Sequence, residues 1–222
     1  MPTPPTPPPR LVLLILILAF LMAMIQIGVL TVAFEKLGLS SRSGMLLLFS
    51  ALFGSRINLP LARVAAEAPE EPPPPLQPGL FGGTPLPFTG STIIAVNVGG
   101  CVIPVFFSLY LLRHTPLSLG ELLPGVLVVA AVSYYFSRPI ARLGIAMPVF
   151  IAPMTAAVTA MLINSAHSAP LAYVSGTCGV LIGADLLRLK DVRKLGAPIA
   201  SIGGAGTFDG IFLTGIVAAL LA

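Results

Sequence analysis

The last quarter of the chain contains the two stretches that decide its interpretation, Ile182-Gly183-Ala184-Asp185 and Ser201-Ile202-Gly203-Gly204-Ala205-Gly206-Thr207-Phe208-Asp209-Gly210. They place two carboxylates, Asp185 and Asp209, in sequence that is otherwise nearly all apolar. A carboxylate in hydrocarbon is costly unless it is paired, protonated or facing water, so such a residue marks a candidate functional site. The two stretches therefore predict a membrane protein with a polar centre.

The composition of the whole chain agrees with a membrane location. Of 222 residues, 56% are hydrophobic and 9% are charged, and the mean hydropathy is +0.99. Soluble domains carry about 25% charged residues, so a water-soluble domain is excluded. The net charge of +4 is spread between apolar runs rather than gathered in a patch, which indicates membrane topology and no nucleic-acid partner.

The apolar runs predict an all-α fold, a polytopic transmembrane helix bundle of about seven segments, several of them broken by Pro or Gly. One transmembrane domain, residues 11–222, follows a disordered Pro-rich tail at residues 1–10. A Pro/Gly-rich loop at residues 67–90 separates the second span from the third. The spans are expected near residues 11–34, 44–65, 91–112, 119–136, 144–163, 169–189 and 199–222.

Two of these spans contain polar amides beside helix-breaking residues. Asn58 stands two residues before Pro60, which removes a backbone donor, so span 44–65 is expected to be kinked or re-entrant. Asn97 precedes a glycine pair, which favours close packing or a broken helix. Broken backbone at membrane depth faces protein or a wet cavity, so Asn58 and Asn97 are candidate lining residues. Satisfaction of the kink explains Asn58 equally well.

The last segment is too short for a complete crossing if its helix starts after the glycines. From Phe208 to the end, 15 residues remain, which is about 22 Å of helix. Residues 203–206 are therefore expected to be irregular backbone, with helix beginning near Asp209. Successive glycine N–H groups can also form an anion nest. The further candidate binding or lining residues are Gly203, Gly204, Gly206 and Thr207.

The positive charges give an orientation for seven spans in the cell membrane. Nine of the twelve Lys and Arg residues fall on the side of the N-terminus, which predicts a cytoplasmic N-terminus and an external C-terminus. The partners expected are the lipid bilayer and either a transmembrane peptide or a small solute. The two histidines lie in different loops without a second ligand nearby, so the sequence predicts no metal site and no cofactor. It does not indicate the oligomeric state.

Asp185 and Asp209 allow three kinds of function. Two carboxylates in a low-dielectric site share one proton and can serve as acid and base in peptide hydrolysis. The same pair can couple proton movement to transport of a solute, as in a transporter or channel-like protein. A non-catalytic membrane assembly factor is the third alternative. Structural interpretations are a helix N-cap for Asp209 and, for Asp185, a pairing near the interface with Arg188 or with a loop lysine.

The residues around both aspartates resemble a known family. Gly183-Ala184-Asp185 and residues 201–212 are similar to the uncharacterised prokaryotic membrane family called domain of unknown function 1614. Residues 54–60, 97–100, 144–148 and 172–176 support this resemblance. It implies a multi-pass prokaryotic membrane protein and supplies no activity.

A looser resemblance is to the GxGD intramembrane aspartyl proteases, which place one aspartate in each of two adjacent membrane helices. Gly183-Ala184-Asp185 matches the last Gly-x-Asp of their motif. Asp209 does not stand in a Gly-x-Gly-Asp, and the Pro-Ala-Leu of presenilin-type enzymes is absent. This resemblance implies Asp185 and Asp209 as a catalytic pair.

Overall fold

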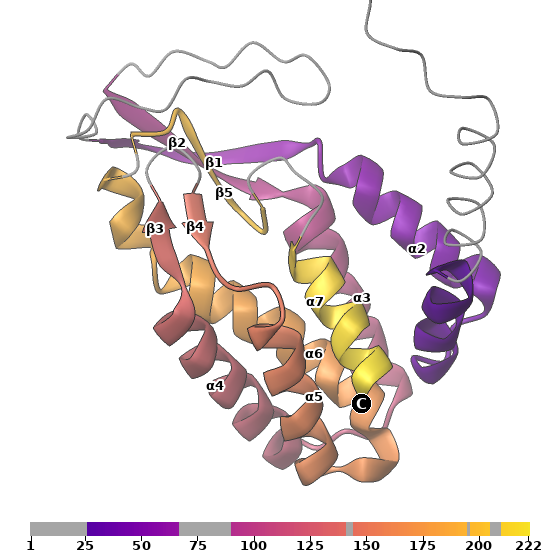
Figure 1. The fold of residues 1–222 in the computed structure, drawn as a ribbon. Coiled ribbons are helices and arrows are strands. Elements are labelled where there is room, and N and C mark those ends of the chain that lie inside the picture. Colours follow the sequence, from indigo (N-terminus) through magenta and orange to yellow (C-terminus); the bar gives the residue numbers. More distant parts are fainter. Residues whose placement is uncertain (1–25, 67–89, 141–143, 195, 205–209) are drawn as a thin grey trace, which may run out of the picture.

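The fold is mostly helical with a small mixed sheet at one end of the helices (Figure 1). The computed structural model describes residues 26–66, 90–140, 144–194, 196–204 and 210–222. The expected tail at residues 1–10, most of span 11–34 and the loop 67–90 lie outside the described residues. Three candidate site residues lie outside them as well, namely Gly206, Thr207 and Asp209.

The helices run between the sheet end and an opposite end that carries the C-terminus (Figure 1). The α-helices are Gln26–Lys36, α2 (Ser41–Gly54), α3 (Ile103–His114), α4 (Leu119–Phe136), α5 (Ile151–Ile163), α6 (Ser168–Val180) and α7 (Gly210–Leu221). Two π-helical stretches adjoin them: η1 (Val98–Val102) leads into α3, and η3 (Leu181–Leu186) continues α6. Short 3-10 helices are η2 (Ser165–His167) and η4 (Leu189–Lys194). π-Helical turns are rare and occur frequently at functional sites. The positions of η1 and η3 therefore indicate the sheet end as a candidate functional region.

The sheet joins strands from distant parts of the chain in the order β1-β2-β5. Strand β1 (Asn58–Ala65) pairs antiparallel with β2 (Ser91–Asn97), and β2 pairs in parallel with β5 (Ile199–Ile202). A separate hairpin consists of β3 (Arg138–Ile140) and β4 (Gly144–Ala146). Because η1 begins where β2 ends, and β2 pairs with β5, the sheet places the start of η1 beside the end of β5.

Helix α6 lies at the centre of the bundle. In the continuous helical stretch Ser165–Leu186, 78% of the most apolar window is buried inside the protein. Small residues allow its neighbours to approach: a Cβ at Gly179 would lie 2.6 Å from Val129 Cβ on α4, and one at Gly176 would lie 3.3 Å from Ala156 Cβ on α5. Backbones that pack this closely are typical of helix contacts in membranes.

The prediction of an all-α bundle with about seven membrane spans is wrong in two respects. Among the described residues, two helices are long and apolar enough to cross a membrane, Leu119–Phe136 and Ser165–Leu186. A third span exists if the helices Gln26–Lys36 and Ser41–Gly54, bent by 105° at their junction, count as one. In addition, parts of the expected spans 44–65, 91–112, 144–163 and 199–222 form the strands β1, β2, β4 and β5.

The local sequence explains why these apolar runs form strands. In β2, four of seven residues are β-branched, namely Thr92, Ile93, Ile94 and Val96, and such side chains favour the extended backbone. In β1, Pro60 lies at a shift in the register of an outer strand of the sheet. Proline is tolerated there because an edge or a bulge leaves its missing N–H unneeded. Hydropathy alone does not distinguish such runs from membrane helices.

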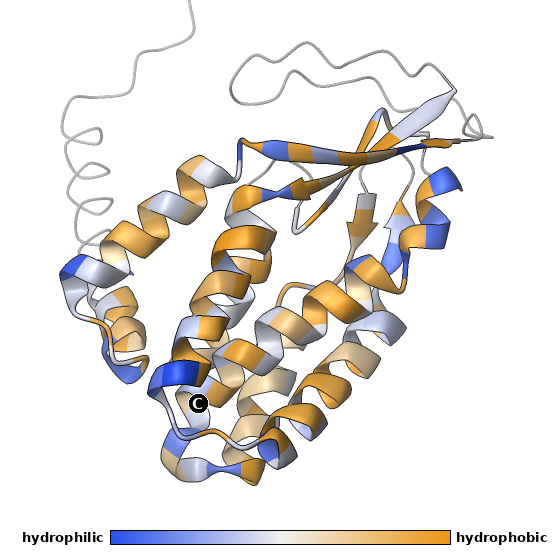
Figure 2. Cartoon of the chain, turned by 180° about the vertical axis from the view of Figure 1, so that it is seen from behind, coloured by the Kyte–Doolittle hydropathy of each residue, from blue (hydrophilic) through white to orange (hydrophobic). Residues whose placement is uncertain are grey.

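Polar residues gather at the two ends of the molecule, and the bodies of the helices between them are mainly apolar (Figure 2). The sheet end carries the described cations Arg56, Arg63, Arg138, Arg188, Lys190 and Arg193. The opposite end carries Lys36, Arg42 and Arg113. The excess of positive charge at the sheet end agrees in direction with the segregation expected from the sequence.

Candidate functional site

Asp185 lies near the end of the π-helical stretch η3, where the path of α6 ends. Its carboxylate is half-buried, and Oδ2 accepts a hydrogen bond of 2.7 Å from the backbone N–H of Gly203. Gly203 directly follows β5 and has a φ of +90°, a conformation that L side chains rarely adopt. The left-handed backbone of Gly203 therefore directs its N–H group to the carboxylate.

Gly203 also packs directly on η1. A Cβ at this position would lie 2.6 Å from both Cys101 N and Gly100 C. No side chain fits at that distance, so only glycine allows β5 to end against η1. The stretch η3, the end of β5 and the stretch η1 thus meet at Gly203.

The side chain of Asn97, the last residue of β2, connects this junction to the end of α2 and to β1. Its side chain is 1% exposed. Nδ2 donates to Ser55 O at 2.7 Å and to Asn58 Oδ1 at 3.0 Å, while Oδ1 accepts from Gly100 N at 2.8 Å. Asn58 Oδ1 accepts a further hydrogen bond, of 2.5 Å, from Ser201 Oγ. The network links the C-cap of α2, strand β1, the end of β2, η1 and β5, and it satisfies buried polar groups whose burial would otherwise be costly.

Four residues that the sequence singled out therefore converge at the sheet end: Asp185, Asn58, Asn97 and Gly203. Gly204 follows with a φ of +132°, so residues 203 and 204 are irregular backbone, as expected. Sequence reasoning missed Ser55 and Ser201, which supply the carbonyl and the hydroxyl of the network. Only their positions beside the expected breaks could have indicated them.

Arg188, one of the partners that the sequence offered for Asp185, binds elsewhere. Its guanidinium donates to Asp191 Oδ2 at 3.2 Å and to the carbonyl oxygens of Tyr134 and Ser137 at 2.8 and 2.9 Å. It also lies 4.3 Å from the centre of the Tyr134 ring. Arg188 thus caps the last carbonyls of α4, where a cation is favoured by the helix dipole, and fixes the segment that follows Asp185.

The contacts between α6 and α7 give the register of the two helices. Ser168 Oγ donates to Ala222 O at 2.9 Å, and a Cβ at Gly176 would lie 3.7 Å from Thr214 Cγ2. The helices are antiparallel, so each step back along α7 corresponds to one step forward along α6. Continuing the pairs 168 with 222 and 176 with 214 places Gly210, the first residue of α7, beside Val180.

Within the described residues, the protein is mostly helical, with two to three candidate membrane spans and a carboxylate where the π-helical η3 meets the turn after β5. The chain belongs to the family described as protein of unknown function (DUF1614), which matches residues 52–221. The matched region includes all four converging residues. No curated protein and no solved structure matches the chain.

Proposed function

We propose that the chain is an integral protein of the cell membrane and that Asp185 forms, with Asp209, the catalytic pair of an intramembrane aspartyl hydrolase. The observation that carries the proposal is the α6–α7 register, which sets Gly210 beside Val180. Asp209 is joined to Gly210 by one peptide bond, so their Cα atoms are about 3.8 Å apart.

This register reduces the difference in depth that a continuous last helix would impose. In one continuous helix the two aspartates would lie about 6 and 16 Å deep, which is too far for a shared proton. Residues 203 and 204 are irregular, and α7 begins at Gly210, which lies beside Val180, five residues before Asp185 in the sequence. The proposal requires that Asp209, which precedes Gly210 in the sequence, bring its carboxylate to that of Asp185 directly or through one bridging water.

The chemistry follows from two carboxylates that share one proton. The ionised carboxylate takes a proton from a water molecule as its oxygen attacks the carbonyl carbon of a peptide bond. The protonated carboxylic acid donates its proton to the amide nitrogen as the C–N bond breaks. The Gly203 N–H group stabilises the ionised form of Asp185 by a charge-assisted hydrogen bond. A transmembrane peptide is the substrate that a site between membrane helices would take.

Proton-coupled transport of a small solute is the second candidate. It is favoured by the irregular backbone near the carboxylate, since η3 and η1 are π-helical and residues 203 and 204 have positive φ. Irregular backbone beside an ionisable residue is found at substrate and ion sites in transporters. A non-catalytic assembly role would need neither carboxylate in ionisable form.

Photolabelling of the purified protein tests the hydrolase. The probe is a hydroxyl isostere of the tetrahedral intermediate, with excess unlabelled inhibitor as competitor. We expect competable labelling of the wild type and of Asp191→Asn, which alters a carboxylate of the same end, and loss of labelling in Asp185→Asn and Asp209→Asn. Asn at position 185 keeps an oxygen that accepts from Gly203 N, so the variant should still fold.

The absence of competable labelling in folded wild type would refute the hydrolase. Proton uptake by liposomes that contain the wild type but not Asp185→Asn would then support transport. If neither measurement distinguished Asp185→Asn from the wild type, the carboxylate would have a structural role, as in an assembly factor.

A further inference from the structure

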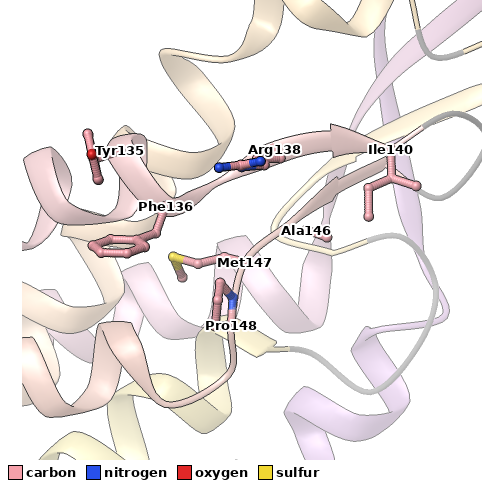
Figure 3. A pocket seen from close by; sticks show the side chains of 7 residues that line it. All are labelled: Tyr135, Phe136, Arg138, Ile140, Ala146, Met147 and Pro148. Carbon is pink, nitrogen blue, oxygen red and sulfur yellow. The ribbon is translucent and has the colours of Figure 1, made fainter.

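An open depression of about 670 Å³ lies beside the β3–β4 hairpin (Figure 3). It is lined by Tyr135, Phe136, Arg138, Ile140, Ala146, Met147 and Pro148. The end of α4 supplies one wall, and the two strands and the segment before α5 supply the rest (Figure 3). The lining is apolar except for the guanidinium of Arg138 and the hydroxyl of Tyr135.

Arg138 differs from Arg188, the other arginine at this end of α4. Arg188 is engaged by Asp191 and two carbonyl oxygens. Within the described part of the chain, Arg138 makes neither a hydrogen bond nor an ion pair through its side chain, which is exposed. Its guanidinium extends along the depression toward the end of α4 (Figure 3). The depression thus combines the guanidinium of Arg138, which has no partner within the described residues, with an otherwise apolar lining.

The length of α4 sets the depth of the depression in a membrane. The helix has 18 residues, about 27 Å, which nearly equals the hydrocarbon core of about 30 Å. Arg138 follows two residues after its end and so lies at the level of the lipid headgroups. Tyr135 and Phe136, 77% and 42% exposed, occupy the interface where aromatic rings are enriched.

The charge of this end favours an anion. Its described cations, Arg56, Arg63, Arg138, Arg188, Lys190 and Arg193, outnumber its described carboxylates, Asp185 and Asp191. Cationic groups next to a membrane span attract anionic lipids. A free phosphate ion would gain nothing from the apolar lining, whereas the acyl chains of a lipid can pack against it.

We propose that this depression binds an anionic phospholipid, with the phosphate on Arg138 and acyl chains over Phe136, Met147 and Pro148. The proposal requires only that α4 spans the membrane, and it is independent of the chemistry at Asp185. The guanidinium can donate two N–H groups to one phosphate, and the net negative charge of an anionic lipid, which phosphatidylcholine lacks, gives the preference for it.

Native mass spectrometry of the full-length protein in neutral detergent tests the proposal. Phosphatidylglycerol and phosphatidylcholine with identical acyl chains are titrated separately, and glycerol 1-phosphate is added as a soluble competitor. We expect wild type to prefer phosphatidylglycerol and Arg138→Ala to bind it about fivefold more weakly, as the loss of one interfacial cation implies. Arg63→Ala removes an exposed arginine of β1 outside the depression and should bind like wild type.

Arg138→Lys keeps the charge and should retain most of the preference for phosphatidylglycerol. Equal binding of phosphatidylglycerol by wild type and Arg138→Ala would overturn the proposal, as would an equal loss in Arg63→Ala. Displacement of the lipid by equimolar glycerol 1-phosphate would also overturn it, because the site would then recognise free phosphate. Matching thermal unfolding of the variants shows that the comparison concerns binding.

Discussion

The carboxylate of Asp185 and the backbone N–H of Gly203 lie 2.7 Å apart, and this hydrogen bond joins the end of α6 to the turn after β5. The two residues are 18 positions apart in the sequence. A charged acceptor makes such a bond stronger than one between neutral groups. The position of the carboxylate therefore depends on the left-handed backbone of Gly203 and on its packing against η1.

Gly203→Ala should destabilise the junction. Alanine at a φ of +90° is strained, and its Cβ would lie 2.6 Å from Cys101 N. We expect the free energy of unfolding to fall by about 2–4 kcal/mol, measured by denaturant unfolding of the detergent-solubilised protein. Gly28→Ala is the matched control, because nothing lies within 4 Å of a Cβ at Gly28. A loss in the control equal to that in Gly203→Ala would contradict the packing argument.

Asn97→Ala should be more damaging than Asn58→Ala. The Asn97 amide makes three hydrogen bonds and is 1% exposed, so its removal leaves Ser55 O and Gly100 N without these partners. We expect a loss of about 2–4 kcal/mol for Asn97→Ala and about 1 kcal/mol for the half-buried Asn58. Unfolding of both single variants and the double variant gives their coupling energy. An additive double variant would show that the amides do not act as one network.

Local signals in the sequence were enough to predict α4. The run from Leu119 to Phe136 contains Glu121 and Pro124 near its start, is apolar beyond them except for Ser133, and ends in aromatic residues typical of the interface. Its start is fixed by Ser118, whose backbone N–H donates to Glu121 Oε2 at 2.7 Å. Both signals lie within the segment itself, so no tertiary contact was needed to find the helix.

The sheet and the partner of Asp185 depend on contacts that the sequence does not display. Strand β1 pairs with β2 across the residues 67–90, and β2 pairs with β5 about a hundred residues later. Pairing of Asp185 with Arg188 or with a loop lysine was one interpretation, because helical spacing suggests local pairs. Asp185 Oδ2 instead accepts from the backbone amide of Gly203, and no side-chain pattern marks an amide.

Arg188→Ala should destabilise the protein more than Asp191→Ala, although the two side chains form one ion pair. Arg188 also donates to two carbonyl oxygens at the end of α4, whereas Asp191 is 30% exposed. We expect losses of about 1–3 kcal/mol for Arg188→Ala and less than about 1 kcal/mol for Asp191→Ala. Arg188→Lys should restore little of the lost stability, because an ammonium group cannot donate to several acceptors in the planar geometry of the guanidinium. Equal losses in unfolding experiments would assign the stabilisation to the ion pair instead.

The sheet end should face the cytoplasm if the positive charges orient the protein. A membrane-impermeant maleimide should label Arg113→Cys, at the opposite end of α3, in intact cells. Arg63→Cys, on β1, should be labelled only after permeabilisation. Wild type measures the background from Cys101 and Cys178, which are both half-buried. The reverse labelling pattern would place the Asp185 junction on the external side.

Gly179→Ala tests whether α4 and α6 are held at backbone contact. A Cβ at Gly179 would lie 2.6 Å from Val129 Cβ, and Val129 is 0% exposed, so the helices must separate or repack. We expect a loss of about 1–3 kcal/mol in the free energy of unfolding. Gly120→Ala, where the nearest atom would be 3.8 Å away, should change it little.

Val129→Ala provides the complementary test at the same contact. Alone, it should destabilise the protein by about 1–3 kcal/mol, because it leaves a cavity between α4 and α6. Combined with Gly179→Ala, it makes room for the new methyl group, so the double variant should lose less than the sum of the single losses. A favourable coupling of about 1 kcal/mol in the double-mutant cycle is expected. Strict additivity would mean that α6 already has space at Gly179, and that close approach does not hold η3 and Asp185 against α4.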